Sequence, residues 1–127
     1  MVTILPQYPH YLYRRESSGA TRLANGDFVQ GSDAWVLHSR CREETNGKGE
    51  EISTADVLSY RFASLVHMPS GTARIAEGIE VIVSEQSLDG YDLTDDVIRT
   101  LKFDGTIRIK ALCAKFDVGR LHCRLWL

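Results

Sequence analysis

Hydrophobic side chains recur at every second position along most of the chain, which is the period of a β-strand. The alternation is clearest in residues 107–113 and 120–126, and the short turn around Gly119 predicts that they form a β-hairpin. Residues 34–41, 60–68 and 79–83 show the same period, and residues 11–13 show it more weakly. These six segments predict a mainly β fold, a small antiparallel barrel or sandwich of about six strands.

The alternation also predicts which side chains face the core. In residues 34–41 it places Trp35, Leu37 and Cys41 on one face and the polar side chains on the other. In residues 107–113 it places all the odd-numbered side chains, from Ile107 to Cys113, on a single inner face.

One short helix is expected. Thr94 is a suitable N-cap for residues 95–102, with Asp95 and Asp96 in the first turn, where carboxylates interact favourably with the helix dipole. The apolar side chains of that segment would face inward. Residues 53–58 are compatible either with one helical turn or with an approach to the next strand.

Residues 43–51 are polar throughout and contain two glycines, so they predict a projecting mobile loop. Its charged residues are Glu43, Glu44, Lys48, Glu50 and Glu51. The 127 residues are otherwise expected to form one domain, 1–127, since this length suits one compact core.

Composition narrows the class of protein. Hydrophobic residues make up 43% of the chain and charged residues 25%, which is typical of a globular domain and not of a disordered or coiled-coil protein. We expect no secretory signal, because residues 1–7 lack the basic start and the long apolar stretch that such a signal requires. We expect no membrane contact, because no segment approaches the ~18 apolar residues of a membrane span. Three cysteines, an odd number, predict reduced and packed thiols.

Charge is distributed unevenly although the net charge is only −2. Residues 77–104 are strongly acidic and include Asp92, Asp95 and Asp96, whereas the final hairpin carries Arg108, Lys110, Arg120 and Arg124 on its polar face. One interpretation is a solvated sheet face that pairs with the acidic segment before it. The other is a surface for an acidic partner, a polyanion or a second copy of the chain.

Candidate chemistry is sparse. His38 and Cys41 are three residues apart, and His122 and Cys123 are adjacent. On a strand, the two side chains of each pair point to opposite faces, so we expect no metal site. The Gly47-Lys48 pair lacks the rest of a phosphate-binding loop, and no nucleophile motif is present. We therefore predict a protein that is not an enzyme and holds no cofactor.

One alternative function rests on the last strand. Trp126 shares the strand phase of Arg120, His122 and Arg124, and an aromatic among basic residues is typical of a surface that binds single-stranded nucleic acid. The alternative hypothesis is therefore an OB-like module that binds single strands.

The layout of the second half resembles a known family. The segment Arg-Ile-Ala-Glu-Gly-Ile-Glu-Val-Ile-Val (residues 74–83) precedes an acidic stretch, and residues 107–126 form a closing hairpin that ends Leu-His-Cys-Arg-Leu-Trp. This layout is similar to that of the head-completion proteins of long-tailed bacteriophages, also called head-closure or head–tail connector proteins.

The resemblance implies a small β-barrel that assembles as a homo-oligomeric ring, a dodecamer in the virion. Such a ring lies below the portal and its adaptor, docks the tail and closes the channel through which DNA passes without sequence recognition. A loop between early strands would project into the channel or toward a neighbour, the position of residues 43–51 here. The implied location is the virion, assembled in the cytoplasm of a bacterial host.

Overall fold

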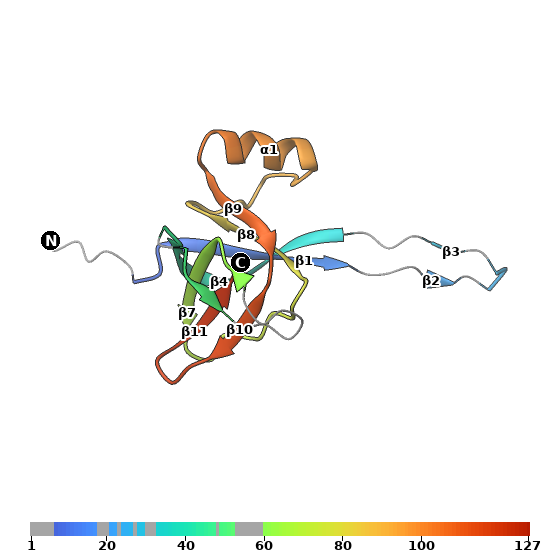
Figure 1. The fold of residues 1–127 in the computed structure, drawn as a ribbon. Coiled ribbons are helices and arrows are strands. Elements are labelled where there is room, and N and C mark those ends of the chain that lie inside the picture. The colour runs from blue at the N-terminus through green and yellow to red at the C-terminus, as the bar shows by residue number, and fades with distance from the viewer. Residues whose placement is uncertain are drawn as a thin grey trace, which may run out of the picture.

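The computed structural model describes residues 7–17, 21, 22, 24–26, 28, 29, 33–47, 49–52 and 60–127 (Figure 1). The elements in these ranges are β1 His10–Ser17, β2 Thr21–Arg22, β3 Phe28–Val29, β4 Asp33–Thr45, β5 Glu51–Ile52, β6 Tyr60–Arg61, β7 Ser64–Pro69, β8 Glu80–Ser84, α1 Asp95–Phe103, β9 Ile107–Leu112, β10 Lys115–Val118 and β11 His122–Trp126. The fold of these described ranges is therefore mainly β with one helix, as predicted.

Seven strands form one antiparallel sheet in the order β10-β11-β7-β4-β1-β8-β9. The sheet is not closed into a barrel, but its two edge strands, β9 and β10, follow each other in the chain across Cys113 and Ala114. Strand β4 joins the two halves, because its first part pairs with β1 and its last four residues pair with β7.

The sheet buries apolar side chains on both faces. Leu12, Val81 and Val83 belong to one core cluster, which the two halves of the sheet enclose. Tyr13 and Ile82, the next residues along the same strands, belong to a second cluster with Ile98 and Leu101 of α1. Because α1 covers this second face, β8 is buried on both sides and reads as a continuous apolar run.

Two irregularities in strand pairing change which side chains face which cluster. In the β1–β4 ladder, Leu12 pairs with Ser39 but Tyr13 pairs with Leu37, so β4 carries an extra residue. Leu37 consequently lies on the face opposite Cys41, where it is 46% exposed. The prediction that Leu37 and Cys41 share an inner face is wrong, because a one-residue insertion reverses the phase of a strand.

The second irregularity lies in the β8–β9 ladder. Val83 pairs with Ile109 whereas Ser84 pairs with Ile107, which leaves Arg108 as the extra residue. Ile109 therefore packs against the first cluster and Ile107 joins the second. The expected single inner face for residues 107–113 is wrong for the same reason.

The helix forms as predicted. The Thr94 side chain accepts a hydrogen bond from the Val97 backbone N–H at 3.3 Å, and Asp95 and Asp96 occupy the first turn. Ile98 and Leu101 are buried against the sheet. Among the described residues, no helix has the length and hydrophobicity that crossing a membrane requires.

The predicted projecting loop at 43–51 is shorter than expected. Strand β4 continues through Glu43 and Glu44 to Thr45, and Glu43 is only 6% exposed. The chain then turns near Asn46 and enters β5, which pairs with β6. Lys48 and residues 53–58, where a helical turn was considered, lie outside the described residues.

A different element projects from the body. Strands β2 and β3 pair with each other and with no other described strand. Figure 1 places them well outside the body of the sheet, beyond the ends of β1 and β4 where Ser17 pairs with Asp33. We refer to the paired strands β2 and β3 as the arm.

Candidate functional site

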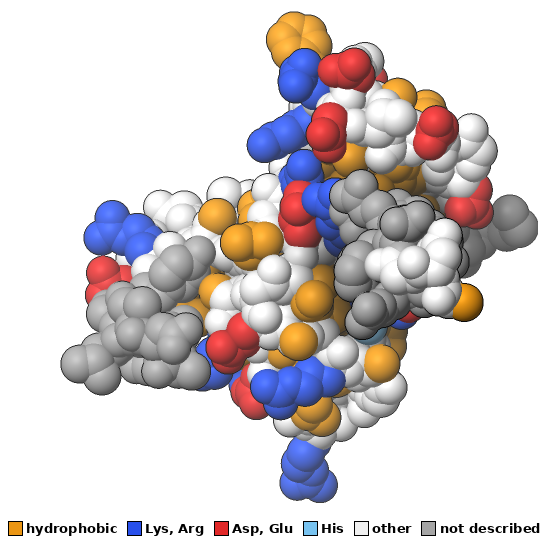
Figure 2. Space-filling view, turned by 90° about the vertical axis from the view of Figure 1, so that its right-hand side faces the viewer, with side chains coloured by type: hydrophobic (Ala, Val, Ile, Leu, Met, Phe, Trp, Pro, Cys, Tyr) orange, Lys and Arg blue, Asp and Glu red, His pale blue; other side chains and the backbone are white. Residues whose placement is uncertain are grey.

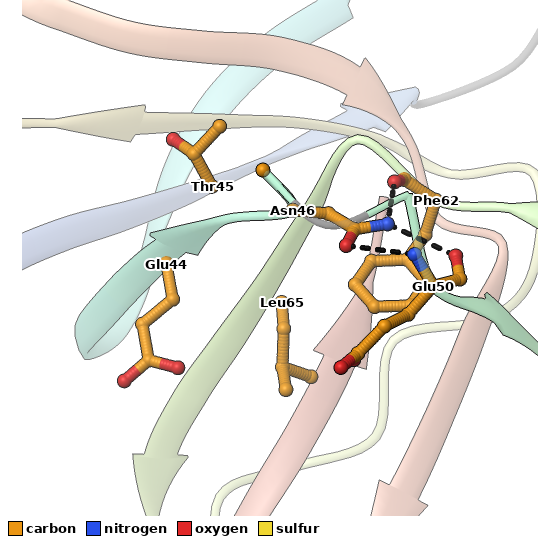
Figure 3. A pocket seen from close by; sticks show the side chains of 7 residues that line it. Glu44, Thr45, Asn46, Glu50, Phe62 and Leu65 are labelled. Carbon is orange, nitrogen blue, oxygen red and sulfur yellow. Dashed lines mark hydrogen bonds between the residues drawn. The ribbon is translucent and has the colours of Figure 1, made fainter.

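A recess of about 200 Å³ opens where the end of β4 meets the start of β7. Figure 3 shows the side chains around it, which come from both strands and from the turn that follows β4. The lining residues are Glu44, Thr45, Asn46, Gly47, Glu50, Phe62 and Leu65. We call this feature the Glu44–Glu50 recess.

Asn46 builds one wall of the recess. Its side-chain Nδ2 donates to the carbonyl oxygens of Phe62 at 2.7 Å and Glu50 at 3.0 Å, and its Oδ1 accepts from the Glu50 backbone N–H at 3.0 Å. The Asn46 backbone N–H donates to the Ala63 carbonyl at 2.9 Å. One side chain thus closes the turn and ties it to the chain before β7, so the recess has a preformed shape.

Two carboxylates lie on either side of Leu65 in the recess. In Figure 3 the side chains of Glu44 and Glu50 point the same way on the two sides of Leu65. The Glu44 carboxylate pairs with both Arg42 and His67. A side-chain nitrogen of each residue lies 3.4 Å from a Glu44 carboxylate oxygen. Glu50 has no basic partner in the part of the chain that the structure describes. The recess therefore suits a cation with an aliphatic stem, such as an arginine or lysine side chain.

Sequence reasoning selected Glu44 and Glu50 but not the residues that make the recess hollow. Asn46 next to Gly47 is a turn signal, yet the part played by Phe62 and Leu65 depends on strand pairing across the sheet. Glu51, in β5, lies 3.8 Å from Arg61 and does not line the recess.

Glu43 belongs to a buried network instead of a loop. Its Oε1 accepts hydrogen bonds from Ser64 at 2.7 Å and Thr45 at 3.1 Å, and its Oε2 accepts from the Arg108 guanidinium at 2.7 and 2.8 Å. Burial alone raises the pKa of the Glu43 carboxyl, but these hydrogen bonds outweigh it and hold the pKa below its ordinary value. This carboxylate connects β4, β7 and β9 across the core.

The network continues to the surface through Arg108. The guanidinium also contacts Glu85, whose carboxylate lies 3.5 Å from His10 Nε2. His10 Nδ1 accepts the Glu43 backbone N–H at 3.1 Å, which requires that nitrogen to be unprotonated. Burial, followed by the nearby Arg108, lowers the pKa of His10. The Arg108 guanidinium thus pairs with two carboxylates of its own chain and does not present a free charge to a partner.

The basic residues that were predicted to share one face lie in different parts of the fold. Lys110 pairs with Glu80 at 3.0 Å, and Arg15 pairs with the same carboxylate at 3.2 Å. Lys110 and Asp95 line one groove beside α1, whereas Asp96 pairs with Arg99 at the helix surface. Asp92 is exposed on the segment before α1. On the face shown in Figure 2, acidic and basic side chains are intermixed.

The other two predicted basic residues lie on the β10–β11 hairpin. Arg124 pairs with Asp117 at 2.9 Å, but Arg120 has no acidic partner among the described residues. Leu121 is 84% exposed and Val118 is 66% exposed beside it. We call residues 118–121 the hairpin tip.

The geometry does not favour the alternative of a single-strand binding face. Trp126 is only 7% exposed, and both Lys115 and Arg124 lie 5.3 Å from the centre of its ring. Its faces are therefore occupied by side chains of the same protein. Stacking a base on this indole would require these contacts to be broken.

The remaining candidates for chemistry are buried or structural. The three cysteine thiols are buried, and burial raises the pKa of Cys41 to about 12 and that of Cys113 to about 11. The rings of His67 and His122 meet edge to face at 4.9 Å. Within the described ranges, no group of three His, Cys, Asp or Glu side chains is placed to hold a metal ion.

Comparison with known proteins adds no relative: the chain matches no family model, no curated protein and no solved structure.

Proposed function

We propose that this protein is a structural virion component of the head–tail junction. In this proposal its copies form a ring below the portal and adaptor, close the DNA channel and dock the tail. The protein carries out no reaction of its own. The family layout of residues 74–83 and 107–126 supports this proposal, as does a mainly β fold with surfaces suited to protein contacts.

The arm is the observation that carries the proposal. An isolated two-stranded ribbon is marginally stable in water, because each strand leaves one edge unpaired and has little apolar surface to bury. Among the strands that the structure describes, the two strands of the arm pair only with each other, and they lie away from the body (Figure 1). A ribbon of this kind gains stability when it packs on another molecule, as expected of a subunit in an assembly.

The structure changes the part that the acidic residues play in this proposal. Glu43 is removed from the candidate channel surface because it is buried in its network with Arg108. Glu44 and Glu50 are exposed, but they flank a recess that suits a basic side chain. Their proposed role is therefore contact with a neighbouring subunit.

A loop replacement tests the role of the arm. Because Ser17 pairs with Asp33, residues 18–32 can be replaced by Asn-Gly, a two-residue turn that keeps the β1–β4 register. Each variant is co-expressed with the cognate portal and adaptor, and the complex is isolated through a tag on the portal. We expect the full chain to co-purify and the arm-less variant to be lost while keeping its melting temperature. Failure of the full chain to co-purify, or equal recovery of both proteins, would overturn the proposal.

A further inference from the structure

We infer that the Glu44–Glu50 recess receives the Arg120 side chain of a second copy, so that copies join head to tail. This inference deepens the proposed function, since it rests on assembly into a ring and names the surfaces that meet. The partner is another copy of this chain, recognised through the hairpin tip at residues 118–121.

The recess and the hairpin tip lie at opposite ends of the same strand ladder. Trp126 pairs with Leu65, which lines the recess, whereas His122 pairs with Pro69, next to the tip. Four residues of strand span about 13 Å, and Arg120 lies two residues beyond His122. The separation exceeds the length of an arginine side chain, so Arg120 cannot fill the recess of its own chain.

Charge and shape match across these two surfaces. Of the four basic residues predicted for the partner face, Arg120 is the one without an acidic partner in the described part of the chain. A guanidinium suits carboxylates because its planar group donates several hydrogen bonds in a fixed geometry. Its aliphatic stem would lie over Leu65, with the guanidinium between Glu44 and Glu50 (Figure 3).

The neighbouring side chains support a contact larger than one ion pair. Leu121 and Val118 are exposed beside Arg120, and their burial against the next copy would add apolar contact. Because the two surfaces are different, the contact is heterologous, the kind that forms a ring when the rotation between copies closes. Repetition around the ring would combine contacts that are individually weak.

Charge reversal tests the pairing. Arg120→Glu and Glu50→Arg each place like charges at the contact, so we expect each to reduce the number of copies recovered on the portal and adaptor at least tenfold. The double variant restores opposite charges, and we expect it to recover assembly. Arg99→Glu is the matched control, because Arg99 is an exposed arginine on α1. Assembly of both single variants at the wild-type level would overturn the inference.

A cross-link gives a second readout that does not depend on the phage partners. Gly47 lines the recess and a Cβ there meets nothing within 4 Å, while Leu121 is exposed at the tip. Gly47→Cys and Leu121→Cys proteins, mixed under mild oxidation, should form a disulfide-linked pair. Adding Arg120→Glu to the second protein should abolish it. The native cysteines are buried and do not compete.

The two readouts separate failure of this contact from failure of the proposed function. Cross-linking without co-purification would support the head-to-tail contact and contradict the head–tail role. Co-purification that is insensitive to charge reversal, with no cross-link, would overturn the contact and leave the role standing. Absence of both would overturn both.

Discussion

The buried Glu43 carboxylate gives a stability prediction that can be worked from its contacts. Removing it in Glu43→Ala leaves the buried Ser64 hydroxyl without its acceptor, and an unsatisfied buried group costs about 1–3 kcal/mol. Arg108 loses its inner partner as well. The Arg108 side chain is 32% exposed and keeps Glu85, so that loss lies below the ~3–5 kcal/mol of a fully buried pair.

Together these losses predict that Glu43→Ala lowers the free energy of unfolding by about 3 kcal/mol. For a domain of this size that corresponds to a fall in Tm of roughly 10 °C. Glu43→Gln retains one acceptor oxygen and is expected to lose about half as much. Urea unfolding followed by tryptophan fluorescence measures the change, with the slope of the transition as a check that only stability has changed.

The neighbouring residue supplies the control. The Glu44 side chain is 51% exposed, and its pairs with Arg42 and His67 lie at the surface end of the same strand. Glu44→Ala is therefore expected to change stability by about 1 kcal/mol or less. If Glu43→Ala and Glu44→Ala lowered the free energy of unfolding equally, the assignment of Glu43 to a buried network would be refuted.

Three further predictions test the core, the hairpin turn and the response to acid. Ile82→Ala should cost about 2–5 kcal/mol because Ile82 is fully buried, whereas Leu37→Ala should cost about 0.5 kcal/mol or less; equal losses in urea unfolding would contradict the register. Gly119→Ala places a Cβ 2.5 Å from the His122 carbonyl oxygen, so we expect it to cost about 1–3 kcal/mol and to be visible as a lower Tm. The folded protein lowers the pKa of three histidines, mainly by burying them: His10, His38 and His67. As the pH falls, these histidines therefore take up protons in the unfolded chain before they do so in the folded protein. Stability should therefore be full above about pH 7 and decline below about pH 6.5, and a Tm that stayed constant down to about pH 5 would contradict this.

The local features of the fold were predictable because they depend on neighbouring residues. Thr94 caps α1 as expected, since an N-cap needs only its own hydroxyl and an N–H three residues on. The β10–β11 hairpin forms around Gly119 for the same reason. The period of two in residues 79–83 and 107–126 was enough to predict a mainly β protein.

The candidate site was only partly predictable. Glu44, Glu50 and Arg120 were selected from their charge and position, but the pattern also selected Glu43, Arg108 and Lys110. In the structure, these three side chains form ion pairs within the chain. Polarity marks a residue that needs water or a partner, and it does not say which of the two the fold supplies.

What the sequence determined by itself was the strand period, the capped helix and the mainly β fold, because these follow from side chains close together in the chain. Only the tertiary structure showed that β4 and β9 each carry one extra residue in their ladders. As a result, Leu37 faces outward and Ile107 packs in the second core cluster. The tertiary structure also extended β4 through Glu43 and placed the projecting element at the arm. These outcomes depend on strand register, which is set by contacts between distant segments, and a shift of one residue exchanges the two faces of a strand.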